Sequence, residues 1–117
     1  MKGFIDLVFQ RNGRFYIADW KSNFLGYHRN DYGHAELSKE MINRFYFLQY
    51  HIYTVALHKY LSLRMPRYRY ENDFGGVYYL FLRGISVDMK DNCGVFFDRP
   101  DKKLIDRLCG YFENKQP

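Results

Sequence analysis

The chain has little cysteine and no long apolar run, and each shortage excludes a class of protein. Its 2 cysteines, Cys93 and Cys109, have no CxxC spacing. Neither a disulfide framework nor a zinc site is therefore indicated, and we expect a cytosolic protein. No segment approaches the roughly 18 consecutive apolar residues of a membrane span, and no apolar stretch behind a basic start resembles a signal peptide. We therefore expect no membrane association.

Aromatic residues are abundant instead. The 117 residues include 12 Tyr, 11 Phe and 1 Trp, a content that suits a packed core and flat surfaces that stack on partners or bases. A chain of 14.3 kDa forms one domain or part of one, and we treat residues 1–117 as a single unit. The formal charge of +5 favours a polyanionic partner, although basic residues spread along the chain also serve plain solubility.

The N-terminal part of the sequence predicts a β-hairpin. Residues 3–10 and 14–21 are rich in β-branched and aromatic residues, and Asn12 and Gly13 lie between them. Asn-Gly is the strongest short signal for a two-residue hairpin turn, because a type I′ turn needs positive φ at both central residues. Since the sequence enters strand-like alternation almost at its first residue, we expect upstream sequence to be missing.

The predicted turn fixes which residues of the hairpin face each other. If Asn12 and Gly13 form the loop, counting outward places Asp6 directly opposite Asp19. Side chains alternate along a strand, so Asp19 and Lys21 share one face and Asp6 shares it with them. Opposed residues of an antiparallel pair lie roughly 4.5–5.5 Å apart, where two like charges are destabilising. The hairpin is therefore predicted to hold two acids and a base in one place.

The remainder of the chain predicts an α/β fold, a mixed sheet flanked by helices. Apolar positions recur at helical spacing from about Ala35 to Met65, with a break at Asn43–Arg44. Two further strands, which we expect inside the sheet, and a final helix that begins near Asp101 follow. The predicted later elements are strands at 75–83 and 94–97 and a helix within 99–114.

Two opposed carboxylates in an aromatic hairpin need a compensating cation. Lys21 supplies one positive charge against the two negative charges of Asp6 and Asp19. The residual charge and the oxygen donors favour a hard ion such as Mg²⁺ or Mn²⁺, whose other positions would take water and phosphate oxygens. The alternative, which stays open at this point, is that both acids lie at the wet end of the hairpin and are simply solvated.

Three ordered motifs resemble a known family. The segments GFIDLVF, ADWKSN and LQYHIYTVALHKYL, continued by FGGVYYLFLRG, resemble the nuclease domain at the C-terminus of RecB subunits in bacterial RecBCD helicase-nucleases (exonuclease V). That domain belongs to the PD-(D/E)xK superfamily, so the resemblance implies a restriction-endonuclease-like core and metal-dependent DNA hydrolysis. The likeness covers nearly the whole chain.

The resemblance also implies roles for individual residues. The family's first acidic position falls on Asp6, and its (D/E)xK motif falls on Asp19 and Lys21. The two acids would hold Mg²⁺ together with the backbone carbonyl of Trp20, and the lysine would orient or activate the attacking water.

The family's QxxxY motif falls on Gln49 and Tyr53, which would support the site and contact DNA. Four residues apart on a helix, these two side chains lie on one face. A core contact with one satisfied hydrogen bond is the alternative interpretation.

The resemblance further implies a setting for the chain. It predicts the C-terminal part of a larger, ATP-dependent helicase-nuclease that acts on DNA in double-strand-break repair and recombination, with RecC-like and RecD-like partners. The family's site also uses a glutamate and a histidine from upstream sequence. A second hypothesis is therefore a nuclease fold that binds DNA or a partner subunit without cutting.

Two other features are candidates with simple alternatives. The four histidines have no helical ligand spacing, and we interpret them as surface or satisfied residues; they are His28, His34, His51 and His58. The basic, aromatic segment at 64–73 either clamps single-stranded DNA or contacts a missing domain or subunit. Its candidate residues are Arg67, Tyr68, Arg69 and Tyr70.

Overall fold

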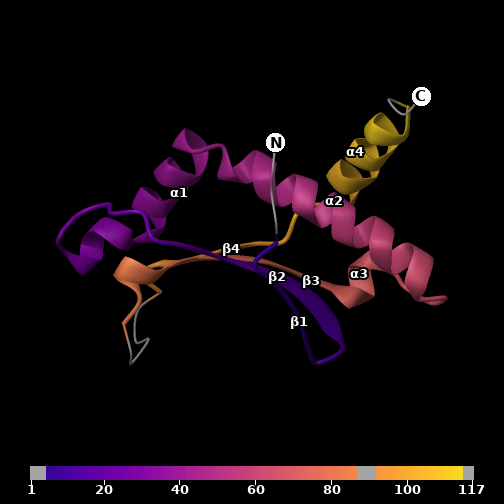
Figure 1. Ribbon diagram of the computed structural model, residues 1–117, viewed down its shortest axis with the longest axis horizontal. Helices are drawn as coiled ribbons and strands as arrows, with labels where there is room; N and C mark the ends of the chain where they lie inside the picture. Colours follow the sequence, from indigo (N-terminus) through magenta and orange to yellow (C-terminus); the bar gives the residue numbers. More distant parts are fainter. Residues whose placement is uncertain (1–4, 87–91, 115–117) are drawn as a thin grey trace.

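The sheet is the frame of the molecule. The structure is a computed structural model that describes residues 5–86 and 92–114. Within them four strands run in the order β1-β2-β3-β4, with β2 and β3 parallel and both outer pairs antiparallel (Figure 1). The strands are β1 (Leu7–Arg11), β2 (Arg14–Lys21), β3 (Phe74–Phe81) and β4 (Val95–Asp98). The predicted α/β fold with a mixed sheet is confirmed, and it has the restriction-endonuclease-like arrangement that the resemblance implies.

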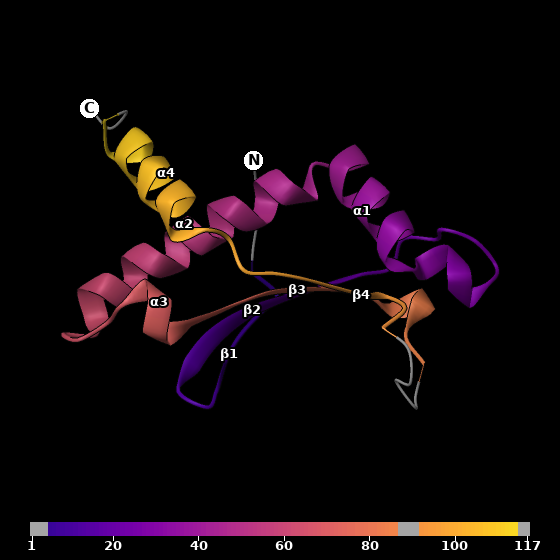
Figure 2. The same cartoon turned by 180° about the vertical axis from the view of Figure 1, so that it is seen from behind.

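The longer helices lie on one side of this sheet. Figures 1 and 2 view the molecule from opposite directions, and both show α1, α2 and α4 on the same side of the strands. A short α3 leads into β3, and single 3₁₀ turns follow β2 and β3. The helical elements are η1 (Arg29–Tyr32), α1 (His34–Asn43), α2 (Tyr46–Arg64), α3 (Tyr70–Asp73), η2 (Leu82–Gly84) and α4 (Lys102–Asn114). In the described part of the chain, no helix is long and apolar enough to span a membrane.

The hairpin has the predicted turn and register. Asn12 and Gly13 have φ angles of 53° and 79°, as a type I′ turn requires. Arg11 pairs with Arg14, and the pairing continues to Leu7 opposite Ala18. Residues 3 and 4, the first two of the predicted strand at 3–10, lie outside the described residues. The register places Asp6 immediately beyond the last pair, on the side of Asp19.

The predicted break in the long helical segment is also confirmed. α1 ends at Asn43 and α2 begins at Tyr46, and Phe45 between them has a φ of 59°. A residue in the left-handed region cannot continue a right-handed helix, so the chain changes direction there. This turn lets two helices, and not one, contact the sheet.

The core lies between the helices and the covered face of the sheet. Ile17 on β2, with Val77 and Tyr79 on β3, is almost completely buried there, and alternate residues of each strand point to this face. The opposite face carries a row of ring contacts across all four strands, formed by Phe9, Tyr16, Tyr78 and Phe97. The acid and the base of β2 therefore point toward the helices and not toward the open face.

Two details differ from the predictions. β4 is an edge strand of the described sheet and not an inner one, because its four residues pair with β3 alone. No helix was predicted between Met65 and the next strand, but Tyr70–Asp73 form the short α3. On α4 the residue after Asp101 begins the helix as predicted, and Ile105 is fully buried.

Candidate active site

Asp19 and Lys21 form the centre of the site, on the covered face of β2. The carboxylate of Asp19 is 3.2 Å from the Lys21 ammonium, and only 3% of Asp19 is exposed. Both residues pair with β3, Asp19 opposite Tyr79 and Lys21 opposite Phe81. Because β2 is an inner strand, the acid is enclosed by strands on both sides and by α2 above. The alternative in which Asp19 is simply solvated is therefore wrong.

Asp6 completes the acid pair from the edge of the hairpin. Its Oδ2 accepts a hydrogen bond of 3.1 Å from the Trp20 backbone N–H, and its carboxyl is within hydrogen-bond reach of the Asp19 carboxyl. Asp6 is exposed to solvent, whereas Asp19 is buried. The predicted register thus brings both acids and Lys21 together.

The two acids differ in proton affinity. Burial, and then the hydrogen bond with Asp6, raise the pKa of Asp19 to about 6 against the attraction of Lys21. The same hydrogen bond, with that from the Trp20 amide, lowers the pKa of Asp6. Two carboxyl groups this close share a proton unevenly, so below about pH 6 the inner acid keeps it while the outer one is ionised. At higher pH both acids are charged and repel each other, and a cation at the pair would relieve that repulsion.

Lys21 is held by α2 as well as by its own strand. Gln49 Oε1 accepts a hydrogen bond of 3.4 Å from the Lys21 ammonium. The ammonium also lies 4.4 Å from the ring centroid of Tyr46 and 5.4 Å from that of Tyr79, where the faces of aromatic rings attract a cation. Its direction is therefore fixed by an acid, an amide and two rings.

Gln49 and Tyr53 of α2 lie beside Lys21 and the acids, and their predicted role in the site stays a prediction. The hydroxyl of Tyr79 donates a hydrogen bond to Gln49 Oε1, and the Tyr53 hydroxyl is within hydrogen-bond reach of Gln49. Burial and the nearby charges of Asp19 and Asp6 raise the pKa of Tyr53. Tyr53 is only 5% exposed, so the geometry agrees with a supporting position beside the acids.

Sequence reasoning missed Tyr46 and the contacts that hold it in place. Asn23 Nδ2 donates to Glu40 Oε2 at 2.7 Å and to the Tyr46 hydroxyl at 3.1 Å, which ties the end of β2 to α1 and α2. Tyr46 precedes Gln49 by three residues, so the helical period was a usable signal. No sequence pattern indicated that Tyr79 lies beside Asp19, because that contact depends on which strand pairs with β2.

The donor set fits a hard divalent ion in part. Two carboxylates at one point, one buried and repelling the other, match the oxygen ligands that Mg²⁺ and Mn²⁺ prefer. Among residues 5–86 and 92–114 no group of three or more His, Cys, Asp or Glu side chains could hold a metal. The ligands predicted from this chain are Asp6, Asp19 and the Trp20 carbonyl, and all three stay predictions.

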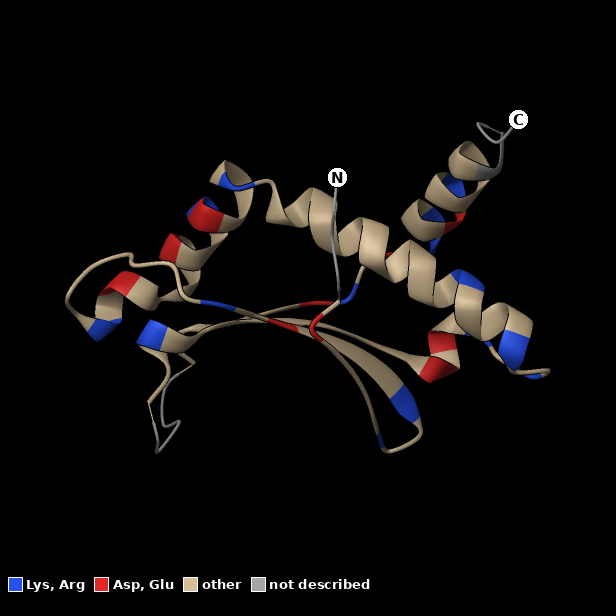
Figure 3. Cartoon of the chain, in the orientation of Figure 1, with Lys and Arg blue, Asp and Glu red and all other residues tan. Residues whose placement is uncertain are grey.

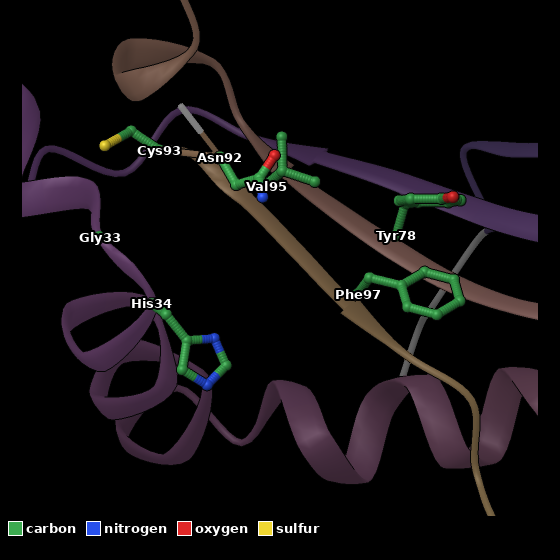
Figure 4. Close-up of a pocket in the computed structure, with 7 residues that line it drawn as sticks. All are labelled: Gly33, His34, Tyr78, Asn92, Cys93, Val95 and Phe97. Atoms are coloured by element: carbon green, nitrogen blue, oxygen red, sulfur yellow. The ribbon is translucent and has the colours of Figure 1, made fainter. Parts of the chain in front are cut away.

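A separate hollow lies along β4. Its volume is about 600 Å³, and Figure 4 shows His34 of α1 on one side and Tyr78 and Phe97 of the strands on the other. Its lining contains no carboxylate, and His34 and Cys93 do not point toward one another in this view. The hollow therefore lacks the donors of the Asp19 site.

The DNA clamp, one of two interpretations of segment 64–73, is wrong for Tyr70. Tyr70 is 2% exposed, and its hydroxyl donates to the Pro100 carbonyl. Tyr68 is half-buried, and its hydroxyl hydrogen-bonds to His58. Tyr70 lies at the start of α3 and is buried, so it offers no free face to a base.

Comparison with known proteins supports the resemblance. The chain is 52% identical over 112 residues, 96% of its length, to the RecBCD enzyme subunit RecB of Haemophilus influenzae. It is 47% identical over 105 residues, 90% of its length, to the RecBCD enzyme subunit RecB of Escherichia coli. For the protein of that name in Mycobacterium tuberculosis H37Rv the identity is 36% over 111 residues, or 90% of the chain. The chain spans only 9% or 10% of the length of these relatives. No family model matches the chain.

Proposed function

From its homology to a short segment of RecB subunits, we propose that the chain is the phosphodiester-cleaving core of a RecB-type nuclease that acts on DNA. The observation that carries the proposal is the buried Asp19, 3.2 Å from Lys21, in contact with the second acid Asp6. A carboxyl group buried beside a second acid is costly to the fold, and such groups with a shifted pKa are typical of functional sites. Repair of double-strand breaks, RecC-like and RecD-like partner subunits and a cytoplasmic setting belong to the same proposal.

Asp6 and Asp19 would hold Mg²⁺, or Mn²⁺ in its place. When bound, the ion supplies positive charge to the phosphate in the transition state and lowers the pKa of a water molecule. Lys21 is the group of this chain that would touch the reacting atoms. Its ammonium, directed by Gln49 and the ring of Tyr46, would donate a hydrogen bond that orients the attacking water toward phosphorus. Gln49 would keep that direction and, being only partly buried, is the one of the motif pair that could contact the DNA backbone, whereas the buried Tyr53 would support it from the core.

The first test is a calorimetric titration with Mn²⁺. We expect the parent chain to bind the ion and Asp19→Ala to lose binding, with the fold of both checked by circular dichroism. Lys103→Ala is the matched control, because Lys103 is an exposed residue of α4 remote from β2. Absence of Mn²⁺ binding in the parent chain would contradict the proposed metal site.

Cleavage of linear DNA is the second test. Lys21→Ala should retain the fold and Mn²⁺ binding and lose cleavage, because the lysine acts on the water and is not a metal ligand in this proposal.

One observation favours a second candidate function. Within the described residues only two carboxylates meet at the site, and an ion held by two carboxylates is held weakly. The second candidate is a module with a nuclease fold that binds DNA or a partner subunit without cutting. It predicts that Lys21→Ala leaves every activity of the chain unchanged, whereas the nuclease proposal predicts loss of cleavage.

A further inference from the structure

The segment that follows β2 presents two aromatic rings to solvent. Tyr27 is 91% exposed and Phe24 is 53% exposed, and their ring centroids lie 4.9 Å apart at an interplanar angle of 71°. A Tyr ring that is exposed to water adds no hydrophobic stabilisation to the fold. Pairs of exposed rings are typical of surfaces that contact a partner.

An arginine completes this aromatic pair. Arg83 of η2 is exposed, its guanidinium carbon lies 5.9 Å from the Phe24 ring centroid, and its Nε donates a 2.7 Å hydrogen bond to the Ser22 carbonyl. Arg83 is therefore fastened to the chain segment that carries the two rings. We call Phe24, Tyr27 and Arg83 the ring patch.

The loop beneath the ring patch is fixed by a buried side chain. Tyr32 is 2% exposed, and its hydroxyl accepts a 3.0 Å hydrogen bond from the Leu25 backbone N–H and contacts the Gly26 carbonyl at 3.4 Å. Both backbone groups lie between the two rings in the sequence. The rings are thus presented on an ordered loop, so binding would cost little conformational entropy.

The ring patch lies at the same edge of the sheet as Lys21. β2 and β3 are parallel, so their carboxyl ends, which continue into residues 22–28 and into η2, meet at one edge. Figure 1 shows η1 and the orange turn after β3 at this end, and Figure 3 shows basic residues on both. Phe24 follows Lys21 by three residues, a distance of at most about 10 Å in extended chain. Ligands of open α/β sheets bind at such carboxyl ends.

We propose that the ring patch is a stacking site for a base of single-stranded DNA whose backbone passes Lys21. The inference rests on the proposed function, because that function supplies the strand at Lys21. Rings stack on any base, and a cation beside them attracts the phosphates. A duplex already stacks its own bases, so the ring patch selects single strands.

The test measures binding of a short fluorescein-labelled oligothymidylate by anisotropy, without divalent ions so that no cleavage occurs. Loss of one stacked ring should weaken binding between about fivefold and a hundredfold in Tyr27→Ala. Tyr27→Phe keeps the ring and should bind within about twofold of the parent. Phe24→Ala should weaken binding in the same range as Tyr27→Ala.

A matched control exists at the far end of α2. Tyr60 is 54% exposed, and the Arg64 guanidinium carbon lies 5.2 Å from its ring centroid, so Tyr60→Ala removes an equivalent pair away from Lys21. We expect this variant to bind like the parent. An equal loss in Tyr60→Ala and Tyr27→Ala would overturn the proposal.

An abasic oligonucleotide of the same length isolates the stacking contact. The parent and Tyr27→Ala should bind it equally, because it offers no base to the ring. Unchanged oligothymidylate binding in Tyr27→Ala, as a protein-docking surface would give, would overturn the inference, as would a loss that persists on the abasic chain.

Titration of Mn²⁺ in the same samples separates the two proposals. Mn²⁺ binding without an effect of Tyr27→Ala on DNA binding contradicts the stacking site alone. Base-dependent DNA binding through Tyr27 without Mn²⁺ binding supports the stacking site and contradicts the metal site alone.

Discussion

The two strands of the hairpin carry matching residues in very different surroundings. Val8 on β1 pairs with Ile17 on β2, yet Val8 is 39% exposed and Ile17 is fully buried. Asp6 and Asp19 repeat the contrast, since Asp6 is exposed and Asp19 is buried. β1 is the edge strand and β2 lies between β1 and β3. Position in the sheet, and not residue type, therefore decides which apolar residue forms core and which acid is difficult to ionise.

The largest expected difference between the strands is in stability. Ile17→Ala should lower the free energy of unfolding by about 3 kcal/mol, because it leaves a cavity in the core. Val8→Ala should lower it by about 1 kcal/mol or less, because the side chain is already half in water. Urea denaturation measures both values. Equal losses would mean that the edge strand is covered in solution.

The second difference concerns the charges of the two acids. The folded-state pKa of Asp19 is raised from 3.8 to about 6, so the folded protein holds this proton more tightly than the unfolded chain. Stability is therefore lost as pH rises from about 4 to about 6. Near neutral pH we expect Asp19→Asn to be more stable than the parent by about 1–2 kcal/mol, after loss of the Lys21 ion pair. This gain should vanish near pH 4.

Asp6→Asn is the matched variant, and we expect it to change the free energy of unfolding in the opposite direction. The pKa of Asp6 is lowered by its hydrogen bonds, so its ionised form stabilises the fold above the ordinary Asp pKa. Asp6→Asn should therefore be less stable than the parent near neutral pH, and the deficit should shrink as pH falls below about 4. Denaturation curves at several pH values measure both variants. Stabilisation by both substitutions would contradict the unequal sharing of the proton.

The third difference concerns metal affinity and pH. A metal ion must displace the proton from Asp19 but not from Asp6, whose pKa is lowered. The apparent Mn²⁺ affinity should therefore rise about tenfold between about pH 5 and pH 6 and level off above about pH 7. Calorimetry across this range measures the slope. A flat affinity would mean that Asp19 is not a ligand.

Local signals predicted the hairpin and its acids, and the reasons are physical. A two-residue Asn-Gly turn determines its own register, so the approach of Asp6 to Asp19 needed no knowledge of other elements. Such local signals could not predict the order of the strands, because β2 and β3 pair in parallel although the whole helical region separates them in the sequence. Tyr79 beside Asp19 was therefore missed.

Burial was the least predictable property of the aromatic residues. Tyr70 was a candidate for contact with DNA or a partner but is buried, whereas Phe24 and Tyr27 drew no attention and are exposed. Each group combines Tyr with nearby basic residues, so composition does not distinguish them. The difference comes from what packs beneath each segment.

The smallest expected effect concerns the surroundings of Lys21, which β2 provides and the edge strand does not. β2 brings the Lys21 side chain beneath α2, where the Tyr46 ring lies 4.4 Å from the Lys21 ammonium. Tyr46→Leu removes this ring and should slow DNA cleavage about threefold to fivefold, as a partly exposed cation–π contact is worth about 0.5–1 kcal/mol. Tyr46→Phe keeps the ring and should stay within about twofold of the parent. Initial cleavage rates at saturating Mn²⁺ measure both.

The control for this last comparison lies on the same helix. Tyr60→Leu removes the ring that lies beside Arg64, far from the acids, and should leave the cleavage rate unchanged. If Tyr46→Phe and Tyr46→Leu slow cleavage equally, the hydroxyl bonded to Asn23, and not the ring, positions the lysine. The proposed cation–π contact would then contribute nothing, and the link from β2 through Asn23 to α1 would explain why Lys21 is held in the direction of the acids.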